Sequence, residues 1–219
     1  PYGSFSPVFE DYTLPSQPLT FFRAGKQNNV PLLTGWVTGD ASLRGNPTVS
    51  VEQYKADAIK NYGDFADDFL NVFPGNTDDE VKASQLKLSL CTFAAFQSHF
   101  WAEHNPSPAY VYQFSFVPTD KPGFQKYGAF HSAELAYALN TLHKWNRPWQ
   151  ARDYEMEKVM SAYWVNFTKT GNPNGPGLPE WKAHSQHAWN VMELGEKVSN
   201  QSTTLKDEFE FLEKINATK

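Results

Sequence analysis

The chain has 219 residues, of which 40% are apolar and 16% aromatic, enough to bury a core and too many for a disordered segment. Its net charge of -5, with no basic cluster, gives no electrostatic reason to expect a nucleic acid or an anionic membrane as partner. No apolar run approaches the length of a membrane span, so no span is expected.

The first 28 residues are rich in Pro, Ser and turn formers, and they predict an extended approach with one short helix near residues 19–25. The apolar run NVPLLTGW, residues 29–36, predicts a buried strand, and Asp40 lies just beyond its end. The pattern then becomes helical over three segments, residues 51–62, 64–73 and 78–101.

The segment AYVYQFSF, residues 109–116, alternates and is rich in β-branched and aromatic residues, which is typical of a strand. A loop over residues 117–130 follows and leads to His131. Beyond it, the pattern predicts two helices, one short strand and a closing helix, over residues 132–142, 153–170, 189–194 and 205–215.

Strands separated by helical stretches predict an α/β sheet. Only two or three strands are visible, which is too few for an independent sheet covered by this many helices. A stable monomer of this chain alone would leave a long sheet edge bare, and a bare edge is an aggregation hazard. The economical interpretation is that the chain is the later part of a larger fold.

His131 lies between a glycine-bearing loop and a helical run, in GAFHSAELAYALNTL. An imidazole titrates nearest neutrality, so it suits proton transfer when a carboxylate and a nucleophile accompany it. Asp40 and His131 both follow predicted strands, and open α/β sheets carry their chemistry at the carboxyl ends of strands. An acid followed by a His is the end of the Ser, acid, His order of α/β-hydrolases.

The nucleophile of such a triad should come earlier in the chain. No G-x-S-x-G occurs in the 219 residues, and no HGGG-type oxyanion motif occurs either. Ser132 is adjacent to His131, but neighbouring side chains at the start of a helix point in different directions, so Ser132 is rejected as nucleophile. Cys91 lies in the apolar stretch KLSLCTFAAF, which predicts a small buried residue without a catalytic role.

Segments spread over nearly the whole chain resemble, in order, the type-B carboxylesterases, the cholinesterase-like branch of the α/β-hydrolases. They are FSPVFEDYTLP, PLTFFRAGKQNNVPLLTGWVTGDAS, AYVYQFSF, GAFHSAELAYALNTL and MSAYWVNFTKTGNPNGPGLPEW. By this resemblance Asp40 stands where the family has its triad acid and His131 where it has its triad base. Glu134 completes the family's H-x-x-E pattern, in which the Glu is structural.

The sequence departs from the family at the acid position. The family usually has Glu within an acidic pair there, whereas this chain has Asp40 preceded by Gly39, which shortens the side chain by one methylene. Asp is the acid of many other hydrolases, so we favour Asp40 over a surface turn residue. Phe130 is a candidate for lining the acyl or alcohol pocket, and a core aromatic is the equal alternative.

The resemblance implies that residues 1–219 are the C-terminal portion of a single α/β-hydrolase domain with the last sheet strands and their covering helices. The expected activity is hydrolysis of small-molecule carboxylic esters by Ser-His-Asp acyl transfer, without a cofactor. The nucleophilic serine and the oxyanion hole would come from an N-terminal part, which is the expected partner. The alternative, from another class, is a non-catalytic adhesion or scaffold protein on the same fold, and a free-standing binding module ranks last.

Two groups of histidines have spacings that suit a metal ion. His184 and His187 are three residues apart, and His99 and His104 flank Glu103. Because no cysteine or carboxylate cluster joins them in sequence, we expect solvated surface and no metal site. Sequons begin at Asn166, Asn200 and Asn216, but such short motifs arise often by chance, so the compartment stays open.

Overall fold

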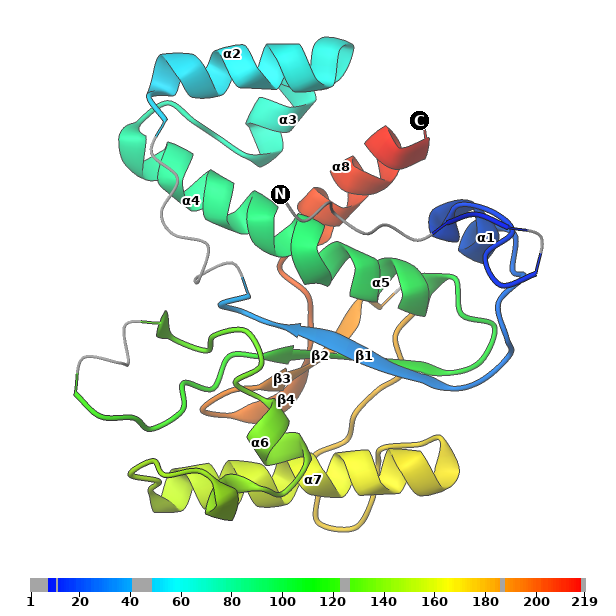
Figure 1. Ribbon diagram of the computed structural model, residues 1–219, viewed down its shortest axis with the longest axis vertical. Helices are drawn as coiled ribbons and strands as arrows, with labels where there is room; N and C mark the ends of the chain where they lie inside the picture. The colour runs from blue at the N-terminus through cyan, green and yellow to red at the C-terminus, as the bar shows by residue number, and fades with distance from the viewer. Residues whose placement is uncertain (1–7, 11, 41–48, 123–126, 186–187, 218–219) are drawn as a thin grey trace.

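The computed structural model describes residues 8–10, 12–40, 49–122, 127–185 and 188–217. A sheet lies in the middle of this part of the chain, with helices on both of its faces (Figure 1). Within the described residues the sheet has four strands in spatial order: β1 (Leu32–Val37), β2 (Ala109–Phe114), β3 (Asn190–Leu194) and β4 (Val198–Ser202).

The first three strands are parallel and the last is antiparallel. β1 pairs with β2 over six residues, and β2 pairs with β3 over three. β4 returns along β3 after a short connection. The sequence predicted the first three strands and missed β4, because its residues VSNQS are polar and lie at the partly exposed edge, where the alternation of apolar and polar residues is lost.

Within the described residues, five helices lie on one side of the sheet, with α2 (Val51–Tyr62) and α3 (Ala66–Val72) stacked beyond the others, and two cover the other face (Figure 1). The other helices of the first group are α4 (Asp78–Leu90), α5 (Phe96–Glu103) and α8 (Lys206–Ala217). The second group is α6 (Leu135–Ala138) and α7 (Ala151–Thr170), and the short α1 (Pro18–Arg23) lies beside α5. Capping hydroxyls mark two starts: Ser50 accepts a hydrogen bond from Gln53 N, and Thr77 from Glu80 N.

Two predicted helices differ from the structure. The expected helix over residues 78–101 is divided into α4 and α5 by a π-helical turn, Cys91–Ala95. The expected helix over residues 132–142 was wrong except for the four residues of α6. Ser132 and Asn140 have φ values of 69° and 55°, in the left-handed region that a continuous right-handed helix excludes.

The sheet alternates its side chains between two cores. On β1, Trp36 faces the larger group of helices and its neighbour Val37 faces α6 and α7. On β2, Val111 and its neighbour Tyr110 divide in the same way. Both cores are rich in buried aromatics, including Phe73, Phe100 and Phe209 on the first side and Tyr137, Tyr163 and Trp181 on the second. The sheet is therefore a rigid support for the residues that follow its strands.

Candidate active site

A close approach of two backbone segments brings Asp40 to His131. Just past β1, Gly39 N donates to Ala129 O at 2.8 Å, and Gly39 forms an isolated parallel bridge with Phe130. A Cβ atom at Gly39 would lie 2.3 Å from Ala129 O, so only glycine allows this approach. Asp40 and His131 are the next residues on the two segments, which places their side chains together at the carboxyl end of the sheet.

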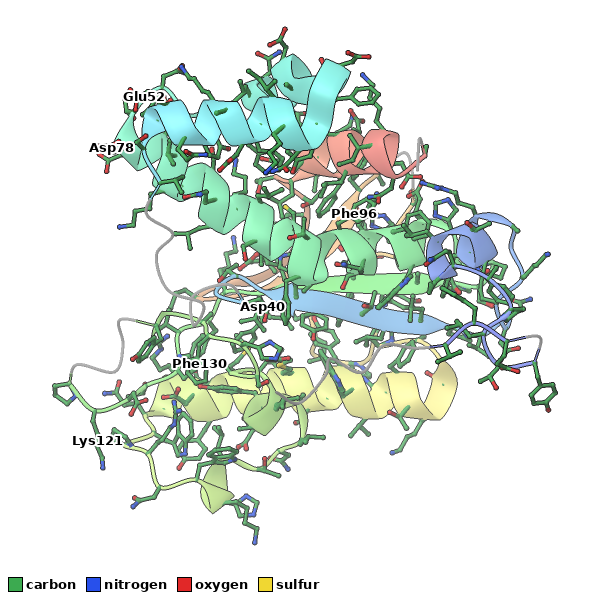
Figure 2. The ribbon with its side chains drawn as sticks, turned by 45° about the horizontal axis from the view of Figure 1, so that its top comes forward. Asp40, Glu52, Asp78, Phe96, Lys121 and Phe130 are labelled. Carbon is green, nitrogen blue, oxygen red and sulfur yellow. The ribbon has the colours of Figure 1, made fainter. Side chains whose placement is uncertain are left out.

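The carboxylate of Asp40 is held through both of its oxygens. Oδ1 lies 2.7 Å from Nδ1 of His131, and Oδ2 accepts a hydrogen bond from Val37 N at 3.0 Å. The Asp40 side chain is 4% exposed. Figure 2 shows Asp40 at the end of β1, with Phe130 nearby on the α7 side of the sheet. The structure thus brings together the two residues that the sequence assigned as acid and base.

The imidazole of His131 is oriented on one side and open on the other. A carboxylate only accepts hydrogen bonds, so the contact with Asp40 requires the proton on Nδ1 and leaves the lone pair of Nε2 on the opposite side of the ring. The His131 side chain is 53% exposed. Phe93, from the π-helical turn, contacts the ring edge to face at 5.2 Å between centroids. A neutral ring in this state can accept a proton at Nε2.

A second carboxylate and a phenol lie near this pair. Burial raises the pKa of Glu134, and the negative charge of nearby Asp40 raises it further. Burial likewise raises the pKa of Tyr112, and Glu134 and Asp40 add to that effect. Charge is therefore disfavoured at both groups, and Asp40 is the carboxylate that contacts His131.

Phe130 packs against a cation beside a very small cavity. The Arg147 guanidinium lies 5.2 Å from the centre of the Phe130 ring. Both residues line a cavity of about 40 Å³ together with Trp149, Trp145, Pro118 and Ser132. The role of Phe130 toward substrate stays a prediction.

Ser132 and Cys91 were both rejected as nucleophiles on the sequence, and their places in the structure agree with that rejection. Within the described residues, no hydrogen bond joins the Ser132 hydroxyl to the His131 ring, and Ser132 occupies a turn with φ 69°. Cys91 is fully buried, as the sequence predicted, and burial raises the pKa of its thiol to about 12. Neither side chain has the arrangement of an activated nucleophile.

The prediction of solvated surface was wrong for His99, which is buried, and for His184. The His184 side chain is 1% exposed, because the segment before β3 folds onto α5 and brings it to His99 and Glu103. Burial lowers the pKa of His99 to about 4, with a further contribution from His184. His187 lies outside the described residues. Sequence spacing missed this cluster because its members come from two distant segments.

A sequence profile of the carboxylesterase family matches residues 1–212. This chain belongs to the carboxylesterase family. It is 24% identical to the liver carboxylesterase 1F of Rattus norvegicus over 230 aligned positions, which cover 94% of this chain and 40% of that protein. It is 38% identical to the carboxylesterase 5A of Canis lupus familiaris over 89 positions, covering 36% of this chain.

Solved structures agree with the fold. A thermophilic PNB esterase superimposes with a TM-score of 0.75 at 20% sequence identity, covering 95% of this chain and 43% of that chain. A second PNB esterase gives a TM-score of 0.73 at 21% identity. The carboxylesterase family member described here thus has part of an α/β-hydrolase fold and spans less than half the length of these relatives. None of its described helices is long and apolar enough to cross a membrane.

Proposed function

We propose that this chain is the C-terminal portion of a single α/β-hydrolase domain in a serine carboxylesterase that hydrolyses small-molecule carboxylic esters. A preceding part of the protein supplies the nucleophilic serine and the oxyanion hole. His131 is the general base and Asp40 the triad acid. The hydrogen bond between Asp40 and His131 at the carboxyl end of the parallel strands carries the proposal.

The reaction assigned to this pair is acyl transfer in two steps, acylation of the serine and then hydrolysis of the acyl-serine. His131 Nε2 takes the proton of the serine hydroxyl while the serine oxygen attacks the ester carbonyl, and it returns that proton to the leaving alcohol. A water molecule then attacks the acyl-serine, with Nε2 again taking and returning one proton. Asp40 keeps the neutral ring with its proton on Nδ1 and stabilises the imidazolium that forms between these steps.

The edge of the sheet supports the existence of a preceding part. β1 is the terminal strand of the described sheet. The chain also covers 40% of the first relative and 43% of the first solved structure named above. We infer that strands of the preceding part continue the sheet beside β1 and place the serine near Nε2 of His131.

Labelling with a fluorophosphonate serine probe tests this function. The full protein that carries this chain is labelled, digested and mapped by mass spectrometry. We expect one labelled serine outside the 219 residues, and we expect His131→Ala to abolish the label because the serine loses its base. Label on a serine within these residues contradicts the assigned division of the triad. Absence of label from the wild-type protein supports instead a non-catalytic adhesion or scaffold role.

A further inference from the structure

Three potential metal ligands converge at a second place in the structure. His99 and Glu103 are four residues apart on α5, so they lie on the same face of the helix. His184 comes from the segment before β3. One ligand atom from each of the three residues lies within 4.8 Å of the other two, and Nε2 of His184 is 3.5 Å from Oε2 of Glu103.

His184 is oriented as a metal ligand would be. Its Nδ1 lies 3.1 Å from Asn190 O, and a carbonyl oxygen only accepts, so Nδ1 carries a proton; in the neutral ring the lone pair is then on Nε2, on the side that faces Glu103. Nε2 is buried and makes no hydrogen bond within the described structure. Histidines that bind metals almost always donate their other ring nitrogen to a carbonyl or carboxylate in this way.

The ring of His99 is fixed between two aromatic side chains. It stacks on Trp189 at 4.6 Å and 8°, and on Phe209 at 4.8 Å and 12°, measured between centroids and ring planes. Its Nδ1 is buried and makes no hydrogen bond to the described residues. A buried polar atom without a hydrogen bond costs free energy, so two such imidazole nitrogens in one cluster require an explanation.

We propose that His99, Glu103 and His184 bind one divalent transition-metal ion of the zinc type. Two imidazole nitrogens and one carboxylate oxygen are a donor set that Zn²⁺ takes in proteins, with the remaining position filled by water. Tetrahedral ligands at about 2.0–2.2 Å from zinc lie about 3.3–3.6 Å apart, so side-chain adjustments of about 1 Å close the cluster around an ion. A cavity of about 420 Å³, lined in part by His99 and Glu103, gives water access to the proposed site.

The proposed site lies at the opposite end of the strands from Asp40 and His131. His184 N donates to Ala109 O, at the first residue of β2, whereas Asp40 follows the end of β1. Because the strands are parallel, the ion would join α5 to the segment before β3 at the amino end of the sheet. The ion would therefore take no part in the ester hydrolysis proposed for Asp40 and His131.

Zinc binding to the full protein that carries this chain tests the proposal. The protein is treated with a chelator, dialysed and titrated with Zn²⁺ in a calorimeter, and Co²⁺ is added separately to record the visible bands of four-coordinate cobalt. We expect tight, saturable Zn²⁺ binding that raises the midpoint of thermal unfolding, together with intense Co²⁺ bands. Mg²⁺ should have no such effect, because it prefers an octahedron of oxygen ligands.

Matched variants distinguish this site from adventitious surface binding. Glu103→Gln and His184→Gln should weaken Zn²⁺ binding by at least about 100-fold and remove the Co²⁺ bands. His143→Gln and Glu155→Gln change an exposed imidazole and an exposed carboxylate elsewhere, and they should leave both signals unchanged. Failure of the wild-type protein to bind Zn²⁺ overturns the proposal, and so does equal binding by wild type and a correctly folded Glu103→Gln variant.

Discussion

Nδ1 of His131 lies 2.7 Å from Oδ1 of Asp40, although the two residues are 91 positions apart in the sequence. The side chain of Asp is shorter than that of Glu by one carbon–carbon bond, about 1.5 Å. The backbone contact between Gly39 and Ala129 draws the two segments together next to this pair, so that the short Asp40 side chain reaches the His131 ring. Gly39 thus allows the backbone approach that places Asp40 beside His131.

Asp40→Asn should lower the rate of ester hydrolysis by about four orders of magnitude. The asparagine oxygen can keep the hydrogen bond from Val37 N, but its amide group then faces Nδ1 of His131. A donor at that position favours the tautomer with its proton on Nε2, which cannot accept the serine proton. Steady-state hydrolysis of a chromogenic ester measures the loss, and an unchanged kcat would remove Asp40 from the triad.

His131→Ala should abolish turnover and lower the free energy of unfolding by about 1–3 kcal/mol, because the buried Asp40 carboxylate loses one of its hydrogen bonds. The side chain is half exposed, so its removal takes little apolar surface out of the core, whereas the loss of the general base removes most of the acceleration. His143→Ala, at an exposed imidazole, is the control and should hydrolyse the ester at the wild-type rate. Equal rates for the two variants contradict the role given to His131.

Gly39→Ala should reduce both stability and activity. Its Cβ atom would lie 2.3 Å from Ala129 O, and a backbone atom cannot move aside cheaply, so we expect a loss of about 2 kcal/mol in the free energy of unfolding. The shift also separates Asp40 from His131. Gly25→Ala is the matched control: its φ of 63° is strained for alanine, about 1–2 kcal/mol, but nothing lies within 4 Å of its Cβ. Urea unfolding and ester hydrolysis of both variants separate the two effects.

The pairing of Asp40 with His131 could be anticipated because both residues follow apolar strands, and the strand pattern was clear in the sequence. β1 could be predicted from the apolar run at residues 29–36, and β2 from the alternation and the β-branched and aromatic residues of segment 109–116. β4 was missed because an edge strand has no buried face to impose alternation.

The local geometry around His131 was beyond sequence reasoning. Residues 132–142 have helical composition, but the contacts between residues 130 and 133 and the left-handed conformations of Ser132 and Asn140 replace most of the helix with turns. The cluster of His99, Glu103 and His184 was missed for a different reason. Its members meet only because the segment before β3 packs on α5, so the spacing of these residues in the sequence does not predict the cluster.

Cys91 should resist alkylation in the native protein. Burial raises the pKa of its thiol to about 12, so very little of the reactive thiolate forms at pH 8, and the sulfur is also shielded from reagent. Peptide mapping after iodoacetamide treatment measures this directly. We expect the Cys91 peptide to be unmodified in buffer and fully modified in denaturant. Equally rapid modification under both conditions contradicts the burial of this residue.

Asp153 joins three segments behind the site. Its carboxylate is fully buried and accepts hydrogen bonds from Thr119 N at 3.1 Å, the Tyr137 hydroxyl at 2.8 Å and Gln150 N at 2.9 Å. Asp153→Ala leaves these donors without their acceptor, so we expect a loss of about 3–5 kcal/mol in the free energy of unfolding at pH 7. Asp67→Ala, at an exposed carboxylate on α3, should stay within about 0.5 kcal/mol of wild type.

The loss caused by Asp153→Ala should depend on pH in a defined direction. Burial alone would raise the pKa of Asp153, but the hydrogen bonds from Thr119, Gln150 and Tyr137 outweigh burial and lower it below its ordinary value of 3.8. A carboxyl whose pKa is lower in the folded state than in the unfolded state stabilises the fold at pH values above its unfolded-state pKa. This stabilisation is lost as the pH falls through the folded-state pKa. Urea unfolding at pH 7 and near pH 3 should therefore show a smaller difference between wild type and Asp153→Ala in acid, and a larger difference there contradicts the ionised, hydrogen-bonded carboxylate.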